Sequence, residues 1–124
     1  MRNNNFSFAF LFMLIQFSSS EILNGQILQF RTVCKLPSEL KESSGLISNN
    51  HGATFWSHND SDGKKIIYEI DSTCKLLRQV FIKNAISIDW EDITQDPSGN
   101  MYIGDFGNNN LNRKDLTIYK IPNP

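Results

Sequence analysis

Five acidic residues at the ends of short apolar segments are the part of this sequence best suited to chemistry. They fall after TFWSHN, at the end of MYIGD, and on either side of the tryptophan in the motif DWED. Gathered carboxylates suit hard, oxygen-binding cations such as calcium. The metal-ligand candidates are therefore Asp60, Asp89, Glu91, Asp92 and Asp105. A structural role stays open, because Asp is also a favoured turn residue that bonds to its own backbone.

One local run can be compared with a calcium-binding loop by counting. From His58, the letters HNDSDGKKIIYE place acids at positions 3, 5 and 12 and glycine at position 6. Position 1 is histidine rather than aspartate, two lysines follow the glycine, and the flanks look like strands instead of helices. A hairpin turn with acidic ends explains the same letters better than an EF-hand.

Two tryptophans and two asparagines are candidates for ligand contact. Trp56 and Trp90 occupy comparable places near predicted strands, where a ring would offer a stacking face to a sugar or aromatic ligand. Packing between sheets is the other interpretation of both. Asn108 and Asn109 belong to the loop that follows MYIGD and are expected near the acids. Arg113, which ends this loop, is interpreted as a solvated loop charge.

A nucleophilic hydrolase is not indicated. The chain has two histidines, His51 and His58, and no G-x-S-x-G motif accompanies them. Ser44 precedes a glycine but lacks the flanking glycine and the partnered base that would activate it.

Residues 1–20 have the layout of a secretory signal peptide. Arg2 precedes an apolar run from Phe6 to Phe17, and three serines then supply a small-x-small cleavage site. The run is shorter than the roughly 20 residues that span a bilayer. A secreted or periplasmic product of residues 21–124, without membrane attachment, is therefore expected. An uncleaved anchor or a buried first helix is the alternative.

The charge balance and the cysteines bear on two further kinds of binding, to nucleic acid and to zinc. Removing residues 1–20 takes away one base and no acid, which leaves 11 basic and 13 acidic residues. A slightly acidic chain is not drawn to nucleic acid by its charge. Cys34 and Cys74 would meet oxidising surroundings after export, where they either pair or stay as two free thiols. Without CxxC or nearby histidines, they do not predict a zinc site.

The chain reads as short strands separated by Gly, Asn and Asp clusters, which predicts an all-β domain. The one helical turn expected is SELKE, with Ser38 as its cap. Strands are expected at 27–36, 44–48, 53–58, 65–70, 76–82, 90–94, 100–105 and 116–121.

These strands also repeat as a group. Leu46 aligns with Ile93, Trp56 with Ile103, and Tyr68 with Tyr119 in the same order. A period of roughly 40 to 50 residues with four short strands is typical of a β-propeller blade. Two similar meanders in a sandwich would give the same pattern. The propeller interpretation predicts about two blades, near 44–82 and 88–122.

The segments LPSELKESSGL, FWSHNDSDG, IDWEDITQDPSGNMYIGDFGNN and RKDLTIYKI resemble the first blades of a group of exported bacterial β-propellers. That group is loosely similar to senescence-marker-protein, NHL-repeat and phytase-like propellers. The resemblance covers about residues 35–122, and DWED and YIGDxGNN are its most specific motifs. It implies a fold and a location rather than a reaction. If the chain stops at Pro124, two blades leave both outer faces open, so a fragment or self-association is expected.

Two function classes follow from these observations. The first is a secreted binding module whose acidic rim recognises a small molecule, a glycan or a protein. The second is a divalent-metal-dependent hydrolase of the phosphoesterase or lactonase type, in which rim carboxylates hold the cation that activates water. The first is favoured, because neither an acid/base pair nor a complete ligand set is visible.

Overall fold

A computed structural model describes residues 28–49, 52–61 and 63–124 of the chain. Residues Arg31–Pro124 form one compact unit. Within the described residues, no helix has the length and apolar character needed to cross a membrane. The predicted signal peptide at 1–20 lies outside the described part, as does Asp62.

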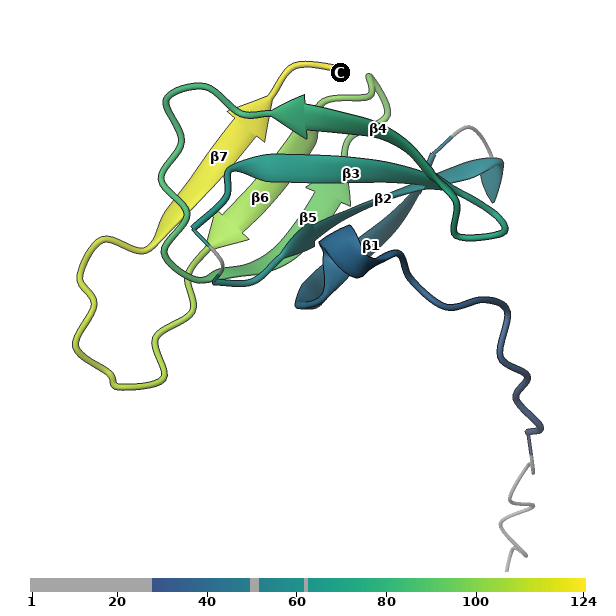
Figure 1. Ribbon diagram of the computed structural model, residues 1–124. Helices are drawn as coiled ribbons and strands as arrows, with labels where there is room; N and C mark the ends of the chain where they lie inside the picture. Colours follow the sequence, from purple (N-terminus) through teal and green to yellow (C-terminus); the bar gives the residue numbers. More distant parts are fainter. Residues whose placement is uncertain (1–27, 50–51, 62) are drawn as a thin grey trace, which may run out of the picture. The chain divides into compact units, whose positions relative to one another are not determined.

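Across the described residues, seven strands form two antiparallel sheets, which confirms the all-β prediction (Figure 1). The first sheet has the order β1-β2-β3-β4 and the second has the order β5-β6-β7, so within each sheet the strands pair in sequence order. The strands of the first sheet are β1 (Ser43–Asn49), β2 (Thr54–Asn59), β3 (Ile66–Asp71) and β4 (Leu76–Phe81). Those of the second are β5 (Trp90–Gln95), β6 (Met101–Asp105) and β7 (Thr117–Ile121).

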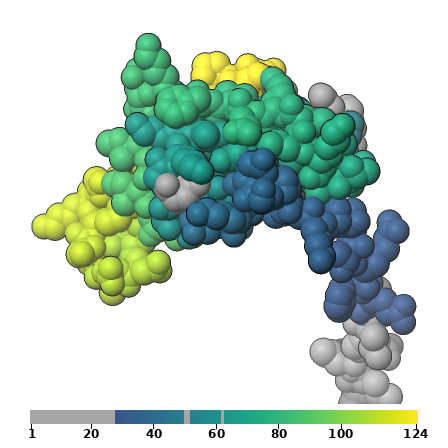
Figure 2. All heavy atoms as spheres, in the orientation of Figure 1, coloured from purple at the N-terminus to yellow at the C-terminus, as the bar shows by residue number. Residues whose placement is uncertain are grey.

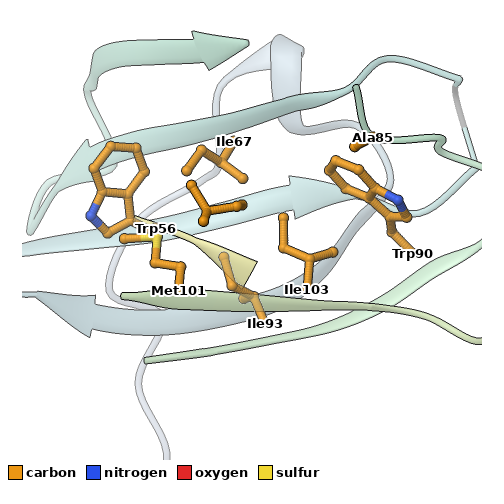
Figure 3. Packing of buried hydrophobic residues seen from close by; sticks show 8 residues of the cluster. Trp56, Ile67, Ala85, Trp90, Ile93, Met101 and Ile103 are labelled. Carbon is orange, nitrogen blue, oxygen red and sulfur yellow. The ribbon is translucent and has the colours of Figure 1, made fainter. Parts of the chain in front are cut away.

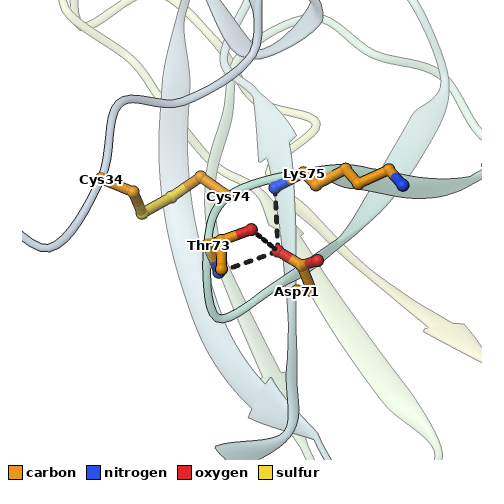
Figure 4. The surroundings of a disulfide bond; sticks show 5 residues. All are labelled: Cys34, Asp71, Thr73, Cys74 and Lys75. Carbon is orange, nitrogen blue, oxygen red and sulfur yellow. Dashed lines mark hydrogen bonds between the residues drawn. A yellow bond between two sulfur atoms is a disulfide. The ribbon is translucent and has the colours of Figure 1, made fainter.

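Two tight turns show how local chemistry sets the strand ends. Between β3 and β4, the Asp71 carboxylate accepts hydrogen bonds from the backbone and hydroxyl of Thr73 and from the backbone of Lys75 (Figure 4). Between β5 and β6, the Asp96 carboxylate accepts hydrogen bonds from the backbone N–H groups of Ser98 and Asn100. Gly99 adopts the positive φ of 83° that closes this turn. Both turns were expected from their sequence.

The segment before β1 differs from its prediction. Residues 28–36 were expected to form a strand, but they form no regular secondary structure. The expected helical turn is a single 3-10 turn, η1 (Ser38–Leu40), which follows Pro37. The Ser38 side chain makes no capping bond and instead donates to Glu39. This stretch pairs with neither sheet, and it ends at Pro37, which has no N–H to donate to a strand ladder and is followed by η1.

A hydrophobic core lies between the two sheets (Figure 3). The face that each sheet turns toward the other is called its inner face here, and the opposite face is its outer face. Trp56 and Ile67 come from the first sheet, while Ile93 and Ile103 come from the second, and all four are buried. β1 packs alongside β5 at this interface. Burying these side chains is the main source of stability that holds the sheets together.

Residues 31–42, called the N-terminal strap here, lie over the outer face of the first sheet. Leu40 of η1 packs against Tyr68 and Ile70 in a second buried cluster. A disulfide joins Cys34 of the strap to Cys74 of the β3–β4 turn, with the Cα atoms 5.9 Å apart (Figure 4). The question that the sequence left open, paired or free thiols, is therefore answered as paired.

The two sheets repeat one pattern of strand pairing. The β1–β2 pair has a bulge at Ser44, and the β5–β6 pair has a bulge at Glu91. The two bulges touch, because the Ser44 hydroxyl donates to the Glu91 carbonyl over 3.0 Å. Counted from the bulges, Tyr68 of β3 and Tyr119 of β7 occupy equivalent positions, as the sequence alignment proposed.

One aligned pair is displaced by a single residue. Leu46 and Ile93 are equivalent as expected, but Ser57 rather than Trp56 is equivalent to Ile103. The bulges are equivalent and leave the offset unchanged, but the connection between the first two strands differs in length. Six residues lie between the paired Ser48 and Phe55 and five between the equivalent pair, Gln95 and Met101, so the offset falls by one. A shift of one residue moves a side chain to the other face of a strand. The corrected alignment therefore decides which faces of the two sheets correspond.

Candidate functional site

Three of the predicted acids meet at one rim of the two-sheet stack. The backbone N–H of Trp90 donates to the Asp60 carbonyl over 3.0 Å, which ties the end of β2 to the start of β5. The Gly107 N–H donates to the Asp89 carbonyl over 3.1 Å, which adds the segment after β6. These bonds bring together the carboxylates of Asp60, Asp89 and Glu91, called the acidic rim here.

Gly107 lets the acidic rim close up. A Cβ at this position would overlap the Asp89 carboxylate and would lie 2.5 Å from Glu91 Oε1. The backbone at Gly107 therefore fits against two carboxylates where no other residue has room. Asp89, just before β5, and Glu91, in β5, are two positions apart, and both carboxylates lie against Gly107 on the same side of the chain.

Asp60 is the most perturbed acid of this rim. Burial, a hydrogen bond with the Asp89 carboxyl, and the charges of Asp89, Glu91 and Glu42 raise the pKa of Asp60 from 3.8 to about 6. Its Oδ1 is buried and has no hydrogen-bond partner among the described residues. Asp60 therefore keeps its proton to a higher pH than an ordinary aspartate, because its charged form is buried beside the Asp89 carboxylate.

Asp105 has a structural role instead of joining the acidic rim. It is buried, with 1% of its surface exposed, and it accepts hydrogen bonds from the backbone of Ile88 and Asp89. Arg113 Nη1 lies 2.9 Å from Asp105 Oδ1 in an ion pair. Since these partners occupy the carboxylate, it is not free to bind a cation.

Arg113 and Asn108 shape the loop at 106–116, which projects from the body of the molecule (Figures 1 and 2). Besides Asp105, Arg113 bonds to the Gly107 carbonyl over 2.8 Å, so it is an internal clamp rather than a solvated charge. Asn108 Oδ1 accepts the backbone N–H groups of Asn112 and Arg113, which closes the loop. Asn109 remains exposed.

A polar hollow of about 360 Å³ lies between this loop and the approach to β5. Asp89 of the acidic rim forms part of its wall, so the hollow and the carboxylates are adjacent. It is lined by Ser61, Ile88, Asp89, Asn108, Asn109, Asn110, Asn112 and Arg113. Asp89, Asn108 and Asn109, which the sequence singled out as site candidates, thus lie around one hollow.

The remaining candidates lie elsewhere. Asp92 is exposed, lines a hollow on the outer face of the second sheet, and accepts the Ile93 N–H through its own Oδ1. Trp56 and Trp90 are both fully buried in the core between the sheets. That is the packing role left open above, and it leaves neither ring a face for stacking on a ligand.

The structure also argues against a calcium-binding loop beginning at His58. Glu69, its last position, lies in β3 and is nearly buried. Its carboxylate accepts hydrogen bonds from Arg78 over 2.6 Å and from Thr54 over 2.8 Å. Over residues 28–49, 52–61 and 63–124, no group of three or more His, Cys, Asp or Glu side chains is arranged to hold a metal ion.

His58 is a buried residue that the sequence reasoning did not single out for its environment. Its ring packs edge-on against Trp90, with centroids 5.7 Å apart, and Nδ1 lies 3.0 Å from the Asn59 carbonyl. Nε2 is buried without a hydrogen-bond partner in the described part of the chain. Burial lowers the pKa of His58, which keeps the ring neutral. A Cβ at Gly45 would lie 2.8 Å from Nε2, so a glycine is needed beside it.

His58 and Asp60 give opposite pH dependences. Because the folded pKa of His58 is below 6.5, the unfolded chain takes up its proton first, and stability falls as the pH drops below about 6.5. Asp60, with a folded pKa of about 6 against 3.8, takes up a proton more readily when folded. It therefore stabilises the protein at low pH, and this contribution is lost as the pH rises through 6.

Asp60→Asn should isolate the second effect. We expect it to raise the free energy of unfolding by about 1 to 2 kcal/mol at about pH 8, where it removes a repelled charge, and to have little effect at about pH 4. Urea unfolding at both pH values measures this difference, with the exposed Glu39→Gln as the control. Equal gains at both pH values would contradict the carboxyl pair.

Comparison with family models, with curated proteins and with solved structures finds no match to this chain. The site is therefore interpreted from its own geometry.

Proposed function

We propose that the chain forms two consecutive blades of a β-propeller and acts as a secreted or periplasmic binding module. The repeated pairing supports the architecture, since both sheets are antiparallel meanders with a bulge at the equivalent place. The first strands of the two sheets, β1 and β5, run alongside one another. That is the relation of innermost strands in neighbouring blades around a propeller axis.

The observation that carries the binding function is the polar hollow beside the acidic rim. Amide and hydroxyl groups line it, Asp89 supplies a carboxylate, and Arg113 is held in place by its bonds to Asp105 and Gly107. Neutral amides with one carboxylate suit a ligand rich in hydroxyl groups, because each hydroxyl both donates and accepts a hydrogen bond. The proposed ligand class is a glycan or a polyhydroxylated small molecule.

Calcium is the cation that this rim would take. A divalent ion between Asp60 and Asp89 would offset the repulsion that raises the pKa of Asp60. Since the described side chains form no ready-made metal group, these carboxylates would have to close on the ion, with water and ligand oxygens completing its coordination. Sugar hydroxyls are oxygen ligands of the kind calcium accepts, so a cation and a glycan would share one rim. The binding experiment therefore needs arms with calcium and with chelator.

Asp89→Asn is expected to weaken glycan binding by the full chain at least about tenfold, because it removes the strongest acceptor of the hollow. Asn109→Ala, at an exposed amide, should give a smaller loss. A panel of immobilised oligosaccharides, followed by calorimetry on any that bind, measures both. Glu39→Gln on η1 is the control, and circular dichroism checks that each variant folds.

If no hydroxyl-rich ligand binds with or without calcium, the proposed function is wrong. Binding that persists unchanged in both Asp89→Asn and Asn109→Ala would place the binding surface elsewhere on the molecule.

A further inference from the structure

The interface between the two sheets has two different halves. The first sheet contributes Ile47, Trp56 and Ile67 from its inner face. The second sheet contributes Ile93, Met101 and Ile121 from its own. Such an interface is heterologous, since the two partners use different surfaces.

The outer face of the second sheet carries residues equivalent to those that the first sheet contributes to this interface. Strand register makes Ile47 equivalent to Thr94, Trp56 to Tyr102, and Ile67 to Ile118. In the second sheet these positions face away from the core and line an apolar hollow of about 230 Å³. Ile118 is 67% exposed there.

Phe106 completes this face. Its ring lies over Gly104, so closely that a Cβ on the glycine would overlap it. Gly104 is the equivalent of His58, whose ring packs into the existing interface against Trp90. An aromatic ring thus occupies the corresponding place on both sheets.

The outer face of the first sheet carries residues equivalent to those that the second sheet contributes to the interface between the sheets. Leu46, Phe55 and Ile70 are the register equivalents of Ile93, Met101 and Ile121, which form the core between the sheets. These three residues line another apolar hollow, of about 240 Å³, beside the strap and its disulfide. Leu46 is 59% exposed, whereas Ile70 is buried against Leu40 of the strap, so the open part of this face lies around Leu46.

We propose that a second copy of this chain docks head-to-tail, with the outer face of its first sheet on the outer face of β5–β7. The open face of β5–β7 repeats one half of an interface that already exists within the molecule, and the part of the first sheet's outer face that the strap leaves open, around Leu46, repeats the other half. The inference rests on the blade repeat proposed above, but not on the ligand. Repetition of such a contact closes into a ring or continues as a filament.

Sedimentation velocity of the full chain over a range of concentrations tests the contact. Self-association is expected for the wild type and should be at least about tenfold weaker in Ile118→Glu, because a charge would be buried in an apolar contact. Leu111→Glu carries the same charge on a loop residue that is 88% exposed and should associate like the wild type. A wild type that stays monomeric at every concentration overturns the proposal.

Mixing two blocked variants tests the direction of docking. Leu46→Glu blocks the other face, so each variant alone should be monomeric, whereas an equimolar mixture should form a heterodimer through the two intact faces. If Leu46→Glu alone still associates, the contact joins two identical faces and the head-to-tail arrangement is wrong. Asp89→Asn should leave assembly unchanged, which separates failure of this contact from failure of ligand binding.

Discussion

Asp105→Ala is expected to lower the free energy of unfolding by about 3 to 5 kcal/mol, because it leaves the Arg113 guanidinium without its buried partner. The carboxylate also accepts the backbone N–H groups of Ile88 and Asp89, which would lose their acceptor at the same time. Urea unfolding at neutral pH measures the loss.

Two matched variants show whether the buried ion pair is the cause. Asp115 contacts the same guanidinium over 3.2 Å but is 63% exposed, so Asp115→Ala should cost less than about 1 kcal/mol. Asp105→Asn keeps an oxygen for the backbone bonds but removes the charge, so its cost should be intermediate. A loss at Asp105 no greater than that at Asp115 would show that the buried pair is not what stabilises this corner.

The same pair connects stability to the binding proposal. Arg113 holds the carbonyls of Asp105 and Gly107 as well as the Asp105 carboxylate. The loop that walls the polar hollow therefore depends on Asp105, which does not itself line the hollow. For this reason Asp105→Ala is a poor test of ligand contact, and Asp89→Asn is the better one.

Removing the disulfide by a double substitution, Cys34→Ser with Cys74→Ser, is expected to cost about 2 to 4 kcal/mol. The bond joins residues 40 positions apart, and closing a loop of that length removes about 4 kcal/mol of chain entropy from the unfolded state. Denaturant unfolding with and without reductant measures the effect. The wild type should lose stability on reduction, whereas the double variant should not respond.

Hydrogen exchange would show which segments are destabilised when the disulfide is removed. Without the bond, amides of the N-terminal strap should exchange faster, while those of β2 and β3 stay protected by the core. If reduction leaves the stability of the wild type unchanged, the strap is held by the Leu40 cluster alone and the disulfide adds nothing.

The sequence by itself determined the features that depend on neighbours along the chain. The strands follow from short β-branched and aromatic segments, and the turns at Asp71 and Asp96 from carboxylates that bond within 4 residues. The order of the repeat was also readable, because Leu46 and Ile93 keep their places. The misplaced match of Trp56 has a physical cause, since the turn between β1 and β2 is one residue longer than the turn between β5 and β6, and turn residues carry no pattern that fixes strand register.

Only the tertiary structure decided what depends on residues that are distant in sequence. It paired Cys34 with Cys74, gathered Asp60 with Asp89 and Glu91, and turned both tryptophans into the core. It also took Asp105 out of the predicted metal set by placing Arg113 against it. Burial and charge pairing set the chemistry of a carboxylate, and both come from the packing of one sheet and loop on another rather than from the local sequence.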